Sequence, residues 1–385
     1  MAFIVRFQAA LSALRTHHVV LLALALRLIW FALCPNEPVS DQFTYHRSAI
    51  GLALGLGYIE PDGSTANLWP VGYPAMLAAM YIVFGMNYAA AYALNIALSL
   101  VLVWGVAQLG TLLFGRESGT LASLLVAIHP TFVMHTTMFT SELPYITGAV
   151  WLFALLLQIG RAEVSLGWSV PVAGIGLGLL CYIRPTAQAF VLIAPLFALL
   201  WRRRSAWLVV ASSLAIAAIA ALVLLPWGLR NQREFGAFSL TSNNGGENLW
   251  MGNNPESDGD YMEFPRDVLP MRIVQRQHVL AERAITFIEA HPFRYLVLCA
   301  KRIGHTLRSD TIAAAWNDVG IGRSFGPWAI LPFKILCSLA HWTLLGLVAL
   351  AWLVRGRSQW RREDAALGLL VLLLSAPFVL IVGGN

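Results

Sequence analysis

Charged residues are scarce in this chain, and their scarcity excludes an ordinary soluble protein. Only 12% of its 385 residues are charged, whereas 58% are hydrophobic and the mean hydropathy is +0.67. Soluble domains carry about 25% charged residues. Apolar runs of about 20 residues, long enough to cross a bilayer, recur along the sequence. The composition therefore predicts an all-α polytopic membrane protein.

Several motifs that would indicate other chemistry are also missing. The four cysteines stand far apart without a CxxC pair, so they predict neither a metal site nor a disulfide framework. No two histidines stand four residues apart on a zinc-binding helix face, and no P-loop or GxSxG motif occurs. Asp258-Gly259-Asp260 has the DxD form of metal-dependent sugar-nucleotide enzymes, but its turn-rich surroundings favour local turn chemistry.

The apolar segments and the arginines between them predict a topology. Positively charged loops favour the cytoplasmic side, and Arg202-Arg203-Arg204 lies on that side if the N-terminus is inside. We therefore expect a multi-pass protein of a bacterial inner membrane with a cytoplasmic N-terminus. The same distribution accounts for the net charge of +6, so no nucleic-acid partner is expected. Nine spans are predicted, at residues 17–35, 88–113, 119–138, 142–161, 167–184, 186–201, 206–226, 328–353 and 364–382.

The spacing of these spans divides the chain into three parts. Residues 1–226 are predicted to form a transmembrane catalytic module that includes a first outer loop at 36–87. Residues 227–327 are predicted to form an outer, periplasmic loop domain, with a turn-rich start and a helical pattern from about 268 to 308. Residues 328–385 are expected to supply the C-terminal transmembrane helices.

The first outer loop is predicted to contain two short helices. Asp41, Tyr45 and Ala49 share one face of a surface helix at its start. The apolar stretch from Tyr73 to Phe84 is too short to span, so it is expected at the interface or as a re-entrant helix.

Ionisable residues gather at the outer ends of the predicted spans. Asp41 lies in the first outer loop, Glu142 at the turn between the third and fourth spans, and Arg184 at the next outer turn. Arg230 and Arg233 follow the seventh span. Charged groups beside apolar spans are costly, so they usually have a partner or a task.

Each of these residues also has a structural interpretation. Asp41 precedes a helical pattern and could be its N-cap. Glu142 could be a first-turn acid favoured by the helix dipole, and Arg184 could reach toward the membrane interface. Arg27, inside the first span, is expected to pair within the bundle or to face a polar cavity.

A series of short motifs resembles the bacterial branch of glycosyltransferase family 39, which has a membrane-embedded C-type fold. After the first span and the acidic loop helix come WPxGYP, SELP, RPT, PWxLRNxxxFG and NGGxNLWxGNNP, and the resemblance covers residues 20–265. Relatives include protein O-mannosyltransferases and the aminoarabinose transferase that modifies lipid A. Members transfer a sugar from a polyprenyl-phosphate carrier to an acceptor on the outer face. The resemblance implies a C-type glycosyltransferase fold with about nine transmembrane helices and outer-face surface helices.

The resemblance also implies roles for particular residues. Asp41 matches the catalytic aspartate of the first outer loop, and Glu142 matches a second acidic position. Many relatives have Asp-Glu where this chain has Asp41-Gln42, which leaves one carboxylate at that motif. Arg184 and Arg230 match recurrent basic positions near the carrier phosphate. Relatives also continue into further spans, so a reduced C-terminal part is expected.

Physical chemistry then predicts an inverting transfer. Asp41 takes a proton from an acceptor hydroxyl or amine, and the anomeric carbon is attacked opposite the leaving phosphate. Arg184, Arg230 or Arg233 stabilises the departing phosphate, so no metal cofactor is expected, with a divalent metal as the alternative.

Four further residues are predicted to contact substrate. Tyr45, Trp69 and Tyr73 are candidates to face the sugar, with anchoring at the membrane interface as the alternative. The resembling NGGxNLW motif adds Asn248.

The expected partners are a polyprenyl-phosphate-linked sugar donor, an envelope glycan, lipid or protein acceptor, and the lipid bilayer. A lipid or glycan transporter or flippase is the main alternative, but it would require polar or broken helices near the middle of the membrane. A non-catalytic, truncated glycosyltransferase-like protein is the second alternative. The sequence does not identify the sugar or the acceptor.

Overall fold

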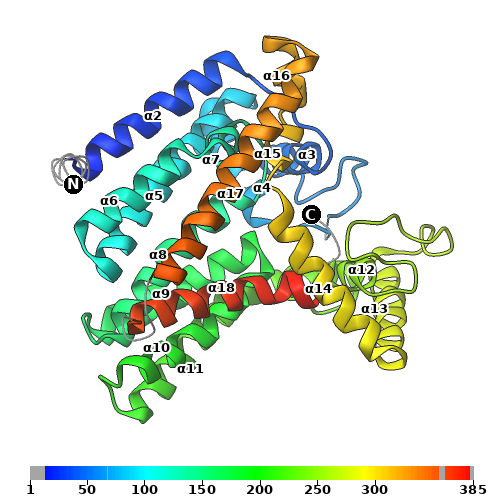
Figure 1. Ribbon diagram of the computed structural model, residues 1–385. Helices are drawn as coiled ribbons and strands as arrows, with labels where there is room; N and C mark the ends of the chain where they lie inside the picture. Colours follow the sequence, from blue (N-terminus) through cyan, green and yellow to red (C-terminus); the bar gives the residue numbers. More distant parts are fainter. Residues whose placement is uncertain (1–13, 67, 355–359, 382–385) are drawn as a thin grey trace.

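A computed structural model describes residues 14–66, 68–354 and 360–381, and these are almost entirely helical (Figure 1). Within those ranges, the only extended pairing is an isolated bridge between Ile59 and Thr65. Seven helices are long and apolar enough to cross a membrane, which confirms the all-α polytopic prediction. They are α2 (Thr16–Leu33), α5 (Tyr88–Phe114), α8 (Glu142–Gly160), α9 (Leu166–Ile183), α11 (Ala206–Phe235), Pro327–Val354, which contains α17 (Ile330–Val354), and α18 (Arg362–Leu380).

The other two predicted spans are not continuous α-helices. Residues 119–138 are divided among α6 (Arg116–Ile128), α7 (Pro130–Met134) and η1 (His135–Thr137). Residues 186–201 begin in the 3₁₀ helix η2 (Pro185–Leu192) and continue as α10 (Ile193–Trp201). Pro130 begins α7 and Pro185 begins η2, because a proline ring lacks the N–H that would continue the preceding helix.

Arg27 donates hydrogen bonds to carbonyl groups at the end of α6, where the helix breaks before Pro130. The last carbonyls of α6 have no N–H partner in their own helix. Arg27 Nη1 donates to the carbonyl oxygen of Ala127 at 2.5 Å, and Arg27 Nε donates to Ser99 Oγ at 2.8 Å. The side chain is fully buried. The predicted pairing of Arg27 within the bundle is thus confirmed, with carbonyl and hydroxyl oxygens as its partners.

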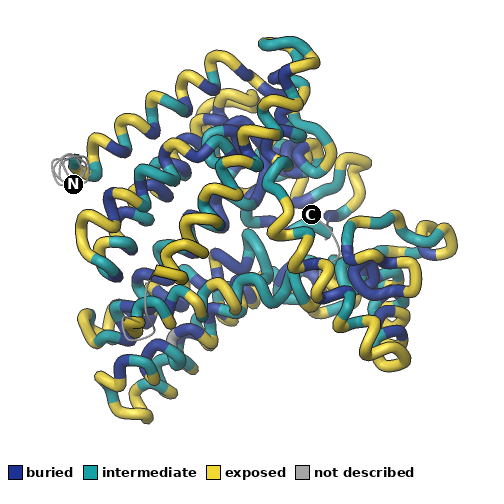
Figure 2. Tube along the Cα trace, in the orientation of Figure 1, coloured by how far each residue is buried: buried dark blue, intermediate teal, exposed yellow. Residues whose placement is uncertain are grey.

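Burial differs sharply between α8 and the last two spans (Figure 2). In α8, 67% of the apolar window is buried, and its side chains join a large core with α9, α10 and α11. In the Pro327–Val354 and Arg362–Leu380 helices only 6% of the window is buried. Exposed apolar side chains on a membrane-spanning helix face the lipid, and α17 carries such side chains along most of its length.

The first outer loop contains the two predicted helices, α3 (Asp41–Ala53) and α4 (Gly72–Phe84). Tyr45 and Ala49 are buried on one face of α3, as their spacing predicted. The start of α4 lies against the end of α9, where a Cβ on Gly72 would approach the Tyr182 carbonyl to 2.6 Å. The glycine of the WPxGYP motif therefore permits the contact that brings the first outer loop to the residues just before Arg184.

The second outer part begins later than predicted, because α11 continues through Pro226 to Phe235. The helical pattern at 268–308 is two helices, which meet at His291 and Pro292. We call residues 236–326 the outer segment. Its helices are α12 (Gly245–Gly252), α13 (Ile273–Ala290), α14 (Pro292–Arg308), α15 (Ile312–Ala315) and α16 (Asp318–Phe325).

Candidate active site

Asp41 is the first residue of α3, and its carboxylate is not a helix cap. Ser40 occupies the N-cap position, without a side-chain cap hydrogen bond, and its backbone φ is 51°. This left-handed conformation is uncommon for a residue with a Cβ and stores strain. The strained turn therefore directly precedes Asp41 and sets the direction in which α3 starts.

The surroundings of Asp41 favour its protonated form more than water does. Burial raises the pKa of the Asp41 carboxyl, and the nearby carboxylate of Glu142 raises it further. A hydrogen bond with the Ser40 side chain acts in the opposite direction. A carboxylate whose pKa is raised toward neutrality is a better proton acceptor than an ordinary aspartate.

Glu142 and Arg184 form an ion pair beside Asp41. Arg184 Nη2 donates to Glu142 Oε1, and Arg184 Nε donates to Ser141 Oγ at 3.0 Å. The side chains are 21% and 34% exposed for Arg184 and Glu142, so the pair lies at an accessible edge of the protein. Burial by itself lowers the pKa of Arg184, but the Glu142 carboxylate more than offsets this effect, so the guanidinium stays charged.

Three aromatic side chains form a wall beside this pair. The Tyr45 hydroxyl donates to Ser141 Oγ at 3.5 Å, and its ring centroid lies 5.8 Å from Trp69 and 5.5 Å from Tyr73. Tyr45 and Tyr73 are buried, whereas Trp69 is partly exposed. The structure therefore places all three next to the acid–arginine pair, and Trp69 is the one with an accessible face.

The remaining predicted residues lie apart from this cluster. Arg230 Nη1 donates to the Ala66 carbonyl at 2.9 Å, and its guanidinium lies 4.8 Å from the Trp227 ring. These contacts attach the first outer loop to the end of α11. Arg233 is exposed on the last turn of α11, and Asn248 is half-buried on α12.

Gln42 has a role that the motif comparison did not reveal. Its side chain is fully buried; Oε1 accepts the Phe139 N–H at 2.9 Å, and Nε2 donates to the Trp316 carbonyl at 3.4 Å. An amide can accept and donate at once, whereas an ionised carboxylate can only accept. Glutamine at this position therefore joins α3 both to the segment before Glu142 and to the outer segment.

Two other neighbours of the pair were missed. Ser141, the serine of SELP, links Tyr45 to Arg184, and its signal was only its place beside Glu142. His135, in η1, is close enough to interact electrostatically with Glu142, and its ring Nδ1 lies 2.8 Å from the Thr131 carbonyl oxygen. Residues 138–141, which are outside the helices, separate η1 from α8, so no helical spacing relates His135 to Glu142.

Metal-ligating side chains do not cluster in the described ranges. Among those residues, no group of three or more His, Cys, Asp or Glu side chains could hold a metal ion. In the DxD sequence, Asp258 Oδ1 accepts the Asp260 N–H at 2.9 Å, and Asp260 Oδ1 accepts the Tyr261 N–H at 2.8 Å. These local bonds confirm the turn interpretation of that motif.

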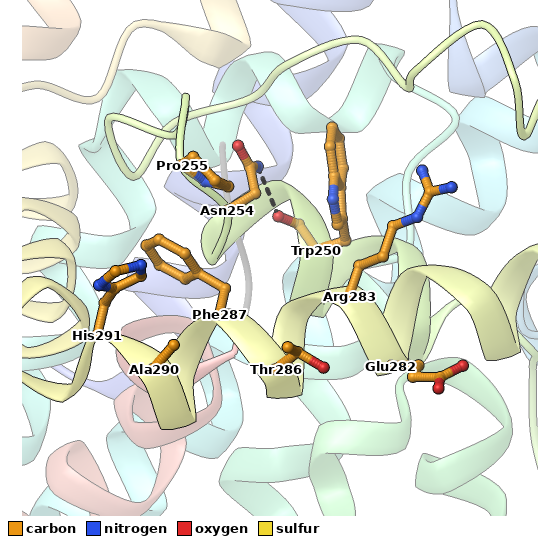
Figure 3. A pocket seen from close by; sticks show the side chains of 9 residues that line it. All are labelled: Trp250, Asn254, Pro255, Glu282, Arg283, Thr286, Phe287, Ala290 and His291. Carbon is orange, nitrogen blue, oxygen red and sulfur yellow. Dashed lines mark hydrogen bonds between the residues drawn. The ribbon is translucent and has the colours of Figure 1, made fainter.

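A groove of about 500 Å³ lies elsewhere, between α12, the loop after it and α13 (Figure 3). Trp250 and Phe287 line it with aromatic side chains, and Glu282 and Arg283 supply its charges. Arg283 pairs with Asp267 across 2.5 Å. None of the residues of the acid–arginine cluster lines this groove. We take the cluster as the candidate active site, because a carboxyl group with a raised pKa, an acid–arginine pair and three aromatic side chains meet there.

The helices and this cluster define a multi-pass membrane protein with an acid–arginine site at the end of its bundle. The family model described as dolichyl-phosphate-mannose-protein mannosyltransferase matches residues 69–229. The matched part contains Trp69, Tyr73, Glu142 and Arg184, and it confirms the resemblance indicated by the sequence motifs. No curated protein matches the chain.

Three structures of an oligosaccharyltransferase from Archaeoglobus fulgidus are similar to this chain at low identity. The apo form has a TM-score of 0.49 at 14% identity, covering 92% of this chain and 38% of that one. The AglB complex with an inhibitory peptide and a dolichol-phosphate has a TM-score of 0.45 at 15% identity, covering 93% and 38%. The complex with Zn and sulfate has a TM-score of 0.46 at 16% identity, covering 96% and 53%. The chain thus spans between 38% and 53% of the length of these proteins.

Proposed function

We propose that this protein transfers a sugar from a polyprenyl-phosphate carrier to an acceptor, with inversion at the anomeric carbon, on the C-type glycosyltransferase fold. The observation that carries the proposal is the convergence of Asp41, Glu142 and Arg184. They come from the start of α3, the start of α8 and the end of α9, and they interact electrostatically in one cluster. The family match over residues 69–229 supports the same class of reaction.

Asp41 acts as the general base. Its carboxylate accepts the proton of an acceptor hydroxyl or amine while the acceptor atom bonds to the anomeric carbon. The bond from that carbon to the phosphate oxygen breaks, and its electron pair leaves with the polyprenyl phosphate. The raised pKa of Asp41 suits this role, because a base whose pKa lies closer to neutrality accepts a proton more readily.

Arg184 stabilises the leaving phosphate. Ser141 and Glu142 hold Nε and Nη2, and no acceptor among the described residues binds Nη1. The guanidinium is therefore fixed in orientation and keeps N–H groups for phosphate oxygens, which it matches in geometry. In this proposal Glu142 positions the arginine, and the arginine replaces a metal ion as the source of positive charge.

The cluster is assigned to the outer face of a bacterial inner membrane, with the N-terminus in the cytoplasm. This orientation is supported by the arginines at the opposite ends of the spans, such as Arg202-Arg203-Arg204 after α10. The acceptor is then an envelope glycan, lipid or protein, and Trp69 is the aromatic residue with a face available to the sugar.

The test is sugar transfer by the purified full chain in lipid nanodiscs, with polyprenyl-phosphate-linked sugars as donors and release of polyprenyl phosphate as the readout. We expect Asp41→Asn to reduce turnover by about 10²- to 10⁴-fold, the usual contribution of a positioned base. The matched control is Asp62→Asn, because Asp62 lies in the same loop but is exposed and hydrogen-bonded only to Ser64.

Asp41→Asn at the wild-type rate would exclude this residue as the base. Donor movement between leaflets without any transfer would instead support the transporter alternative.

A further inference from the structure

The helix α14 has three distinct faces, and one of them is buried against the protein. Leu298, Cys299 and Arg302 are buried. Arg302 Nη1 donates to the Gly252 carbonyl and Arg302 Nε to the Val379 carbonyl, both at 2.6 Å. This buried face therefore joins α14 to the end of α12 on one side and to the end of α18 on the other.

The second face of α14 is an apolar stripe without a protein partner among the described residues. Phe293 is 79% exposed, Leu296 61%, Ile303 46% and Leu307 49%. Their spacing of three, seven and four residues places them along one side of a helix with 3.6 residues per turn. A contiguous row of exposed large apolar side chains indicates a contact with another apolar phase.

The third face of α14 is a basic stripe. Arg294, Lys301 and Arg308 follow one another at intervals of seven residues, and all three are exposed. On a helical projection, the three faces lie about a third of a turn apart, so the basic stripe is separate from both the apolar stripe and the buried face. The helix contains no acidic residue. A positive row beside an apolar row is the arrangement of helices that lie in the interface of a bilayer.

The apolar stripe is continuous with a surface that already faces lipid. Trp342 Nε1 in α17 donates to the Arg308 carbonyl at 2.9 Å, and His341 Nε2 donates to the Leu307 carbonyl at 3.3 Å. Trp342 lies about 12 residues into α17 and so about 18 Å from its start. In Figure 1, α14 runs across the direction of α17. The end of α14 thus meets α17 well along its lipid-facing length.

We infer that α14 is an in-plane membrane helix, with its apolar stripe among the acyl chains of one leaflet and its basic stripe at the phosphates of the lipid headgroups. The partner is the lipid bilayer itself. Because Arg302 ties α14 to α12, this contact fixes the outer segment at a set height over the membrane. The inference is independent of the proposed function.

Spin-label accessibility of the full chain in vesicles tests the depth of α14. Single cysteines are introduced as Leu296→Cys and Ile303→Cys on the apolar stripe, with Glu289→Cys on α13 as the exposed control; the four native cysteines are buried. We expect the ratio of oxygen to nickel-complex collisions at 296 and 303 to be several-fold higher than at 289. Accessibility to the nickel complex equal to that at 289 would overturn the inference. Protection from both reagents would overturn it in favour of a protein partner.

The headgroup contact is tested separately, with the label at 296 and vesicles of phosphatidylethanolamine with and without phosphatidylglycerol. Phosphatidylglycerol is expected to increase protection from the nickel complex in the wild-type background. The triple variant Arg294→Gln, Lys301→Gln, Arg308→Gln is expected to lose that increase. An increase of the same size in both backgrounds would overturn the headgroup contact.

Discussion

Arg27 and Arg184 are both arginines beside long apolar helices, yet the protein uses them differently. Arg27 is fully buried, and all of its described acceptors are carbonyl oxygens or the Ser99 hydroxyl. Arg184 is partly exposed and pairs with the Glu142 carboxylate. Arg27 donates hydrogen bonds to carbonyl groups at the end of a helix, whereas Arg184 forms an ion pair with Glu142 at a partly exposed site.

The difference shows what separates a structural cation from a functional one in such a protein. Four of the five N–H groups of the Arg27 guanidinium donate to protein oxygens, so most of its donor capacity is used within the protein. Arg184 keeps Nη1 without an acceptor among the described residues, while its other two nitrogens fix its orientation. The partners of each arginine therefore distinguish the two roles, which charge and hydropathy alone do not.

Among the changes that test this comparison, Arg184→Lys is expected to have the largest effect. Arg184→Lys keeps the positive charge but cannot hold Ser141 and Glu142 together while also contacting phosphate. We expect kcat/KM for the polyprenyl-phosphate donor to fall by about 10²- to 10³-fold, as when one preorganised charge-stabilising group is lost. The measurement is sugar transfer by purified variant and wild type, with thermal unfolding as the check on folding. A rate of sugar transfer equal to that of the wild type would show that Arg184, like Arg27, has a structural role.

At Arg27 the expected loss is in stability. Arg27→Met leaves the carbonyls at the end of α6 without their donor, so the free energy of unfolding should fall by about 2 kcal/mol. Activity per folded molecule should stay near the wild-type value. Arg27→Lys, which keeps one donor, is the control and should be intermediate in detergent denaturation. A stable but inactive Arg27→Met would give this arginine a catalytic role and remove the contrast.

A smaller effect is expected at Gln42, which links α3 to the cluster. Gln42→Glu can replace both hydrogen bonds only while its carboxyl is protonated, because only then does it still donate to the Trp316 carbonyl. We expect the variant to match the wild type at acidic pH and to lose about 1 kcal/mol of stability when the carboxyl ionises. Thermal unfolding across pH measures this. A pH-independent loss would contradict the hydrogen-bonding role.

The smallest expected change is a displacement of the pH profile. Asp41 must be deprotonated to act, so kcat/KM should rise as pH passes upward through its pKa, which burial and then Glu142 raise. Glu142→Gln removes the contribution of the Glu142 carboxylate to the raised pKa of Asp41, while the contribution of burial remains. The acidic limb of the profile should therefore move to lower pH, whatever happens to the maximal rate. A limb that stays in place or moves upward would contradict the coupling between these carboxyl groups.

Much of the fold was predictable, because hydropathy and span length decide most of it. The seven continuous membrane helices, and helix α3 with Tyr45 and Ala49 inward, follow from patterns of about 20 apolar residues and from helical spacing. The break at Pro130 was signalled by proline but fell within a span predicted to be continuous, whereas the boundary at Pro185 was predicted between two spans. The passage of α11 through Pro226 is the reverse case, since packing of the helix outweighs the local preference of proline.

The residues of the site were predictable from the sequence, but the hydrogen bonds that connect them were less so. Asp41, Glu142 and Arg184 carry signals because charge is rare in this chain, and the structure brings them together. The link through Ser141 and the double hydrogen bond of Gln42 depend on contacts between residues about 40 to 270 positions apart. Arg230 has the same sequence signal as Arg184, but its attachment to Ala66 could be seen only in the folded chain.

The bond between Arg27 and Ala127 also has a consequence for how the protein is made. The two residues are 100 positions apart, so the arginine is synthesised long before its acceptor. At about 5–20 residues per second, the delay is about 5–20 s. During that time the first helix carries a charged side chain without its final oxygen partners. The first helix can therefore reach its final position in the membrane only after α6 has been synthesised. The emergence of residue 127 from the ribosome then sets the earliest time of this assembly step.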